Sequence, residues 1–333
     1  MKHPQLLFAA FISTSIFFSG CNAQSKSQNS FKLSATILLP SVSGRIDHLS
    51  FDNKHQIVFI AALGNNTLEA VDIKSKKVIR TIKNLKEPQG VVFIPESNSL
   101  FIANGGNGEC DVYNAENFQK TVTVKLSGDA DNVRYDAADK KIYVGFGDGG
   151  IAIIDATIFK VITEIKLSGH PESFQVDKTS KKIFVNVPDQ EQIEVIDLET
   201  NSVINKWKMT EAKANFSMAL DAINHRLFVG CRRSPILLII DTQTGQTISS
   251  FSINSDVDDI FYNTVKKEIY LSCGAGYIDV FKQINANSYV ANGKVSTHSG
   301  ARTSLFIPEL NQLIVASPSG FNRSASLSIY DIK

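Results

Sequence analysis

The sequence has almost no net charge and no long run of residues of one charge. Its 34 Lys and Arg residues against 33 Asp and Glu residues give a formal charge of +1. Proteins that hold duplex nucleic acid or an anionic membrane surface by electrostatics concentrate basic residues on one face or in one segment. The composition therefore excludes nucleic acid from the expected partners and leaves a lipid anchor as the expected route to a membrane.

Cysteine is scarce, with four residues in a chain of 333. Proteins that depend on disulfides have many more, so no disulfide framework is expected. Apart from Cys21, the remaining three are Cys110, Cys231 and Cys273, and none has the C-x-x-C spacing of zinc or redox sites. Cys231 and Cys273 each follow an aromatic residue by three positions, which leaves a bridge between them open, but buried free thiols are the favoured interpretation.

The common catalytic motifs are missing or lack their context. There is no G-x-S-x-G and no H-E-x-x-H. The run from Gly145 to Gly150 matches G-x-G-x-x-G, but a strand-like segment follows it where a phosphate site needs a helix, so a hairpin is expected. His170 and Glu172 have no P-C-x-x-C partner motif, which excludes a zinc deaminase. Asp256 begins an acidic cluster that lacks the glycine and closing glutamate of an EF-hand.

Helical periodicity is also absent after the first thirty residues. Apolar residues come in bursts of four to six, rich in Val, Ile, Phe and Tyr, with Gly, Asn, Asp, Ser and Lys between them. Such bursts are typical of short strands joined by tight turns. The sequence therefore predicts an all-β protein.

The N-terminus is typical of an export signal. A basic start precedes an apolar run from Leu6 to Phe18, which is too short to span a bilayer permanently, and small residues precede Cys21. Residues 1–20 are therefore predicted to be a lipoprotein-type signal peptide, Cys21 the lipidated residue and residues 21–30 a tether. Ordinary cleavage after the "CNA" segment remains an alternative, in which Cys21 is lost. The expected location is the periplasm or the outer membrane, with lipid anchoring.

Seven copies of one repeat fill the rest of the chain. Strand-like cores recur at intervals of 41 to 44 residues, and each contains an equivalent landmark residue: Phe59, Phe101, Tyr143, Phe184, Phe228, Tyr270 and Ile314. Each unit fits one antiparallel sheet of about four strands, and sheets of this size must stack to bury their faces. Radial stacking of such units gives a β-propeller. Residues 31–333 are thus predicted to form a single seven-bladed domain. The last unit has three strands, and Phe31–Leu39 is expected to supply the fourth and close the ring.

Two of the repeats carry a family resemblance. The segments "RIDHLSFDNKHQIVFIAALGNNTLEAVDIKSKKVIRTI" and "PESFQVDKTSKKIFVNVPDQEQIEVIDLETNSVINKW" have the order apolar strand, Asn-containing turn, "V-I-D" and a short polar turn. In this order the chain resembles the YVTN-repeat propellers, including YncE-like exported proteins, over about 300 residues. The literal Tyr-Val-Thr-Asn string is absent. The resemblance implies a seven-bladed propeller with a binding or scaffold role.

Polar residues of different kinds stand where the innermost strand of each blade is expected to begin. Twelve residues before each landmark lie Asp47, Gln89, Asp131, Glu172, Phe216, Asp258 and Arg302. Packing alone would favour one repeated small residue, so variation in charge at this position indicates a ligand site at one end of the central channel. Neighbouring residues extend the predicted site: Arg45, His48, Asn104, Asn132, Arg134, His170 and Lys213.

These features predict a binding protein without demonstrated chemistry and without a cofactor. Its expected partner is a small polar molecule, a peptide or an envelope protein. The alternative is a metal-assisted hydrolase or lyase, similar to lactonases or streptogramin lyase, in which Asp131 and Glu172 hold a divalent cation such as Ca²⁺ or Mg²⁺ and His170 or His48 acts as the base.

Overall fold

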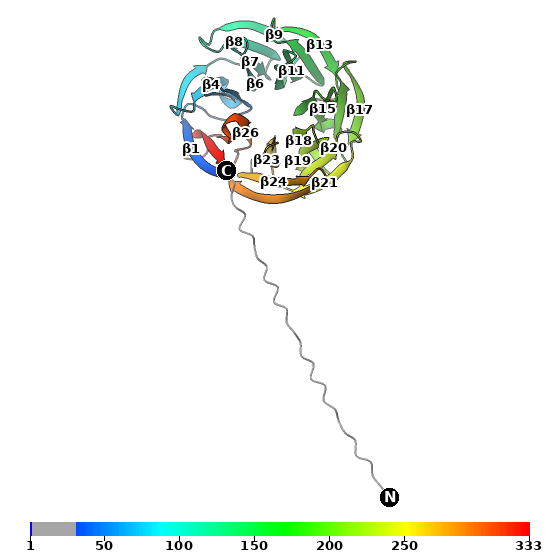
Figure 1. Cartoon of the computed structure of the whole chain (residues 1–333). Helices are drawn as coiled ribbons and strands as arrows, with labels where there is room; N and C mark the ends of the chain where they lie inside the picture. The colour runs from blue at the N-terminus through cyan, green and yellow to red at the C-terminus, as the bar shows by residue number, and fades with distance from the viewer. Residues whose placement is uncertain (2–30) are drawn as a thin grey trace.

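Seven four-stranded antiparallel sheets are arranged around one axis in the computed structural model, which describes Met1 and residues 31–333 (Figure 1). The predicted signal, tether and lipidation site lie outside the described residues, apart from Met1. In six sheets chain order runs from the channel to the outer edge, and in the seventh the first strand of the domain takes the outermost place. The innermost strands are β2 (Leu49–Asp52), β6 (Pro88–Ile94), β10 (Ala130–Asp136), β14 (Phe174–Asp177), β18 (Lys213–Asp221), β22 (Val257–Asn263) and β26 (Thr303–Ile307).

The second and third strands of each sheet form its buried middle. The second strands are β3 (Ile57–Ala62), β7 (Ser99–Asn104), β11 (Lys141–Phe146), β15 (Lys182–Val187), β19 (Arg226–Arg233), β23 (Glu268–Cys273) and β27 (Gln312–Ser317). The third strands are β4 (Thr67–Asp72), β8 (Glu109–Asn114), β12 (Gly150–Asp155), β16 (Gln192–Asp197), β20 (Pro235–Asp241), β24 (Tyr277–Asn285) and β28 (Ala325–Ile332).

The outer strands close the ring. They are β5 (Lys77–Ile82), β9 (Lys120–Lys125), β13 (Lys160–Lys166), β17 (Ser202–Lys208), β21 (Thr247–Ser252), β25 (Ser288–Ser296) and β1 (Phe31–Leu39). β1 pairs with β28 from Phe31 opposite Ile332 to Leu39 opposite Ala325, so the first and last strands of the domain share one blade. The predicted seven-bladed all-β propeller and its closure by Phe31–Leu39 are both confirmed.

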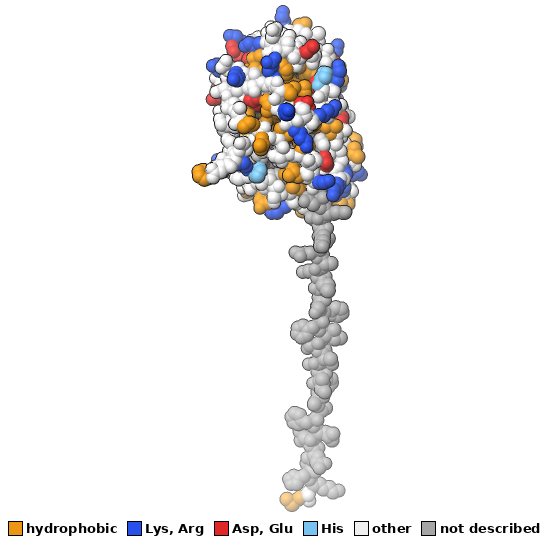
Figure 2. All heavy atoms as spheres, turned by 90° about the vertical axis from the view of Figure 1, so that its left-hand side faces the viewer, with side chains coloured by type: hydrophobic (Ala, Val, Ile, Leu, Met, Phe, Trp, Pro, Cys, Tyr) orange, Lys and Arg blue, Asp and Glu red, His pale blue; other side chains and the backbone are white. Residues whose placement is uncertain are grey.

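The blades adhere through apolar clusters, one at each of the seven junctions between neighbouring sheets. All seven landmark residues are at most 1% exposed. Cys110, Cys231 and Cys273 are buried free thiols, which confirms the favoured interpretation over a bridge. Gly145 to Gly150 form the β11–β12 hairpin, as expected, and within it Phe146 pairs with Gly150. On the outer side of the ring, basic, acidic and apolar side chains are interspersed (Figure 2).

Helical structure is limited to single 3₁₀ turns in the part of the chain that the structure describes. These turns are η1 (Leu63–Asn65), η2 (Pro188–Gln190) and η3 (Pro308–Leu310). None of the described helices has the length and apolarity needed to cross a membrane.

Candidate functional site

The inner strands all begin at the same end of the channel, which we call the channel mouth. Backbone hydrogen bonds hold the starts of neighbouring inner strands together: His48 N donates to Gln89 O at 3.2 Å, and Ser173 N donates to Phe216 O at 3.1 Å. At Gly90 a Cβ atom would lie 2.0 Å from Asp131 O, so only glycine permits this approach of two blades. The fold therefore brings residues that are about 40 positions apart to one place.

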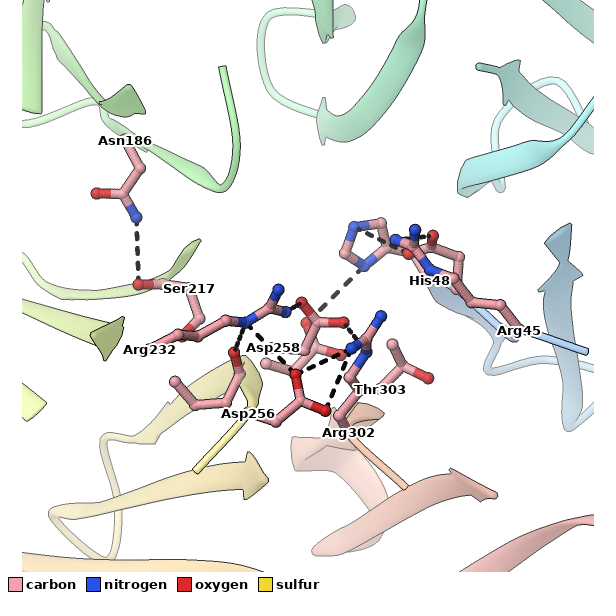
Figure 3. A network of polar contacts seen from close by, with 12 residues as sticks. Arg45, His48, Asn186, Ser217, Arg232, Asp256, Asp258, Arg302 and Thr303 are labelled. Carbon is pink, nitrogen blue, oxygen red and sulfur yellow. Dashed lines mark hydrogen bonds and ion pairs between the residues drawn. The ribbon is translucent and has the colours of Figure 1, made fainter. Parts of the chain in front are cut away.

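Two arginines and two aspartates form an ion-pair network across one side of the mouth (Figure 3). Arg302 reaches Asp256 Oδ1 with Nη1 at 2.9 Å and Asp258 Oδ2 with Nε at 3.0 Å. Arg232 pairs with Asp258 through Nη2 and donates from Nε to Val257 O at 2.9 Å. The Arg232 guanidinium lies 3.9 Å from the centre of the Phe216 ring, so this aromatic residue holds an arginine in place.

His48 lies beside this network, among three carboxylates. Its Nε2 is 3.8 Å from Asp47 Oδ1 and 3.9 Å from Asp131 Oδ1, and its Nδ1 is 3.8 Å from Asp259 Oδ1. Arg45 pairs with the other oxygen of Asp47 at 2.8 Å. Burial, with the charge of Arg134 as the next cause, lowers the pKa of His48 to about 4. The imidazole is therefore neutral at pH 7 and keeps a lone pair.

Several carboxyl groups at the mouth hold their protons unusually tightly. Burial, followed by the charge of Asp258, raises the pKa of Glu172 to about 8. Burial, again followed by Asp258, raises the pKa of Asp259 to about 8. The pKa of Asp131 is also raised, by burial and then by the charge of Asp47. Perturbed carboxyl groups that converge on one concave place are typical of binding and catalytic sites.

Directly below the mouth, the inner strands enclose a channel cavity of about 520 Å³. The end of the cavity next to the mouth, which we call the cavity floor, is formed by His48, Arg134, Ser173 and Asp259. The far end of the cavity reaches Asn53 and Glu309. Between these ends apolar residues such as Val91, Met218, Leu220, Ile260, Phe261 and Phe306 alternate with polar ones such as Ser50, Gln175, Tyr262 and Ser304. A concave place lined by apolar side chains and converging polar groups is the usual form of a small-molecule site.

Arg134 stands out on this floor because its guanidinium lacks an acidic partner. Its Nη1 donates to Val133 O at 2.9 Å, and its Nη2 donates to Ser173 Oγ at 3.2 Å. The group also lies 5.4 Å from the centre of the Phe174 ring. Among the described residues it forms no ion pair, in contrast to Arg45, Arg232 and Arg302. Burial lowers the pKa of Arg134, and the charges of Asp259 and Asp131 act in the opposite direction. An arginine stays charged, so a cation without a direct ion pair faces the cavity.

The predicted site residues fall into three groups. Arg45, Asp47, His48, Asp131, Arg134, Glu172, Phe216, Asp258 and Arg302 gather at the mouth or on the cavity floor. Gln89 and His170 lie together to one side: Gln89 Nε2 donates to Asp129 Oδ1 at 2.8 Å, and His170 Nδ1 is 3.9 Å from Asp129 Oδ2. Asn104 is buried in its own blade and bonds to Glu109 O, and Lys213 points outward to Glu191. Asn132 is buried, with no hydrogen-bond partner for Oδ1 among the described residues.

Three residues at the mouth were not in the predicted set: Arg232, Asp256 and Asp259. The signal in the sequence was the acidic cluster Asp256, Asp258 and Asp259, which needs nearby cations. Arg232, at the end of a second strand, supplies one of them. Of the two carboxylates expected to hold a cation in the alternative hypothesis, Asp131 belongs to a convergent group with Asp47 and His48, and Glu172 is not part of that group.

No family model and no curated protein matches the chain. Among solved structures, hydrazine synthase from Kuenenia stuttgartiensis matches with a TM-score of 0.73 at 14% identity, over 87% of this chain and 95% of that chain. A chain of the structure entitled "Crystal Structure of Mitotic Checkpoint Complex" matches with a TM-score of 0.77 at 14% identity, over 98% of this chain and 99% of that chain. At this identity the likeness shows the fold alone, that of a β-propeller. The resemblance to YVTN-repeat proteins stays a prediction.

Proposed function

We propose that the protein binds a small molecule with a carboxylate group and an apolar body, held in the channel cavity. The observation that carries this proposal is the position of Arg134, whose guanidinium faces the cavity with three of its five N–H groups unused by partners among residues 31–333. A carboxylate is the natural partner of a partly buried guanidinium because two parallel hydrogen bonds form between them.

The channel cavity fits this ligand better than the arginine pairs of the mouth do. Arg232 and Arg302 are already neutralised by Asp256 and Asp258, so a carboxylate there would have to displace existing ion pairs. The cavity volume of about 520 Å³ lies within the range of roughly 300–1,000 Å³ typical of small-molecule sites. Its apolar walls would contact the rest of the ligand and supply hydrophobic stabilisation.

The test is a comparison of simple carboxylates with uncharged and cationic molecules of the same size. Octanoate and phenylacetate are expected to raise the melting temperature of the purified protein and to bind in calorimetry, and octanol and octylamine are expected to do neither. Arg134→Gln should weaken carboxylate binding about tenfold to a hundredfold, the usual cost of losing a hydrogen bond to a charged group. Lys213→Gln, which alters an exposed cation away from the cavity, is the matched control. Equal binding by Arg134→Gln and wild type would refute the proposal.

We also propose that binding takes place outside the cytoplasm, on a protein anchored through a lipid on Cys21. The support is the signal-like sequence of residues 1–20 and the small residues before Cys21. Intact-mass measurement of the protein from its native membrane should give a diacylated N-terminus, and Cys21→Ala should release the protein from the membrane. An unmodified mature chain that begins after Ala23 would support ordinary cleavage instead.

A further inference from the structure

One group of side chains at the mouth has the composition of a transition-metal site. Asp47, His48 and Asp131 each offer one donor atom, and the three donor atoms lie within 4.8 Å of one another. His48 Nε2 is 3.8 Å from Asp47 Oδ1 and 3.9 Å from Asp131 Oδ1. In a tetrahedral or octahedral site with metal–ligand bonds of about 2.0–2.2 Å, neighbouring donors are roughly 3.0–3.5 Å apart. The two distances from His48 exceed this range by a few tenths of an ångström, and the two carboxylate oxygens, which lie within 4.8 Å of each other, would have to approach by up to about 1.3 Å.

The oxygen atoms in this group are left free by the rest of the protein. Asp131 is buried, with 6% of the whole residue and 9% of its side chain exposed. Its Oδ1 has no hydrogen-bond partner among the described residues and points to the imidazole of His48. Arg45 occupies only Oδ2 of Asp47, so Oδ1 remains available on the side of His48. A buried acceptor without a partner costs free energy unless something binds it.

His48 is also oriented as a metal-binding histidine is. Its Nδ1 faces Asp259 Oδ1 at 3.8 Å, and the other oxygen of Asp259 accepts a hydrogen bond from Ser304 N at 2.7 Å. In metal sites the second nitrogen of a ligating histidine commonly faces a carboxylate, which fixes the proton on that side and leaves the lone pair for the metal. The backbone of His48 is held on both sides, by Gln89 O and by Ala61 N.

The charges at the mouth leave room for a divalent cation. Six carboxyl groups gather there, opposed by four guanidinium groups; they are Asp47, Asp131, Glu172, Asp256, Asp258 and Asp259, with Arg45, Arg134, Arg232 and Arg302. If all are ionised, two negative charges remain. Protons on Glu172 and Asp259, whose pKa values burial raises to about 8, can compensate these charges at pH 7, and a divalent cation beside His48 could replace them.

We propose that Asp47, His48 and Asp131 bind one first-row divalent transition-metal ion, of the Mn²⁺ to Zn²⁺ series. An imidazole nitrogen beside two carboxylates suits these ions, whereas Ca²⁺ and Mg²⁺ prefer sites made of oxygen alone. The site is independent of carboxylate binding in the cavity, since the three donors can bind the ion without the ligand. Its position on the other side of the His48 ring from the cavity makes the ion a support for the cavity floor.

The experiment titrates protein that has been stripped with EDTA and dialysed. Calorimetry with Zn²⁺ is expected to show one equivalent, Mn²⁺ weaker binding at the same stoichiometry, and Ca²⁺ and Mg²⁺ no saturable binding. Thermal melting should shift upward, because an ion that binds only the folded protein stabilises it. Asp131→Asn and His48→Gln should no longer bind this equivalent of metal. Asp259→Asn should weaken metal binding about tenfold to a hundredfold, the usual effect of removing a group that faces a ligating histidine.

A double variant with the same residue types is the matched control. Asp129→Asn/His170→Gln removes a second histidine and aspartate at 3.9 Å, outside the proposed group, and is expected to bind Zn²⁺ like wild type. In EDTA, Asp131→Asn should melt no lower than wild type, since it removes a carboxyl group whose ionisation is opposed by burial and by Asp47. Loss of metal binding in this variant would then not be due to misfolding. Absence of a tight equivalent, equal binding of Ca²⁺, or full binding by Asp131→Asn would each overturn the proposal.

Discussion

The inner strands carry polar residues at both ends, and the two ends use them differently. At the end away from the mouth, Asp52, Asp136, Asp177 and Asn263 each accept hydrogen bonds from the backbone N–H groups two and three residues later. This contact recurs from blade to blade because the same hairpin turn recurs, and Asp or Asn stabilises such turns.

At the mouth end the equivalent positions carry different residues, and their contacts differ from blade to blade. Asp47 pairs with Arg45, Asp258 pairs with arginines from two neighbouring blades, and Asp131 has an oxygen without a partner. Burial raises the pKa values of all three. The comparison teaches that an Asp or Asn that recurs with the same turn contact, here in four blades, serves the fold, whereas acidic residues with varying contacts at an equivalent place mark the site.

The largest effect is expected from opening the ring, because the contacts at both ends of the inner strands depend on its closure. Deletion of residues 31–39 removes the whole of β1, including its register with β28 and the contact of Phe31 with Tyr270, whose ring centres are 5.0 Å apart. We expect loss of a cooperative thermal transition, measured by circular dichroism. Deletion of residues 22–30 is the control. A deletion variant that melts within a few degrees of wild type would show that closure by β1 is dispensable.

A smaller effect is expected from a single residue at the far end. Asp177 is 2% exposed, and its Oδ1 accepts from Thr179 N at 2.9 Å and Ser180 N at 3.2 Å. Asp177→Ala leaves these donors without a partner and should destabilise the protein by about 1–3 kcal/mol, a fall of several degrees in melting temperature. Asp177→Asn keeps an acceptor oxygen and should cost less. If Asp177→Ala melted like wild type, the recurring turn contact would not stabilise the fold.

The third effect is expected at the mouth, as a change in pH dependence. Glu172, near Asp258, Asp47, Arg232 and Arg45, has a pKa of about 8 in the folded protein, against about 4.3 for an unperturbed glutamate. A raised folded pKa stabilises the protein at low pH, and this contribution is lost as pH rises from about 4 to about 8.

Denaturant melts of metal-free protein between pH 5 and pH 8.5 measure this slope. Stability of the wild type should fall over the interval, and Glu172→Gln, which cannot ionise, should fall less. Exposed Glu116→Gln provides the control and should retain the wild-type slope. Parallel slopes for Glu172→Gln and wild type would contradict a shifted carboxyl at this position.

The fold was predictable because its information is local and repeated. The landmark residues from Phe59 to Ile314 occur at nearly constant spacing, and a four-stranded sheet can bury them only against another such sheet. The missing strand of the last blade followed from the same count. The convergence of Asp47, Asp131 and Asp258 could also be predicted, since equivalent positions of a ring must lie at one end.

The contacts within the site required coordinates. Lys213 begins the long strand β18, whose pairing with β19 shifts in register between Asn215 and Ser217. The Lys213 side chain points away from the mouth and pairs with Glu191. Arg232 pairs with an aspartate of the next blade, and its sequence neighbours do not indicate this. The channel cavity depends on the sizes of side chains from all seven inner strands, so one sequence without coordinates does not reveal its position.

The direction of β1 indicates how a lipid-anchored molecule would be oriented relative to the membrane. Outer strands run opposite to inner strands, so Phe31 lies at the far end of the propeller, and the chain reaches the mouth only after Leu39. With the predicted lipid on Cys21, the chain would approach the bilayer from that far side. The proposed metal ligands would then lie on the side away from the membrane, and the end of the channel near Asn53 and Glu309 would face the membrane.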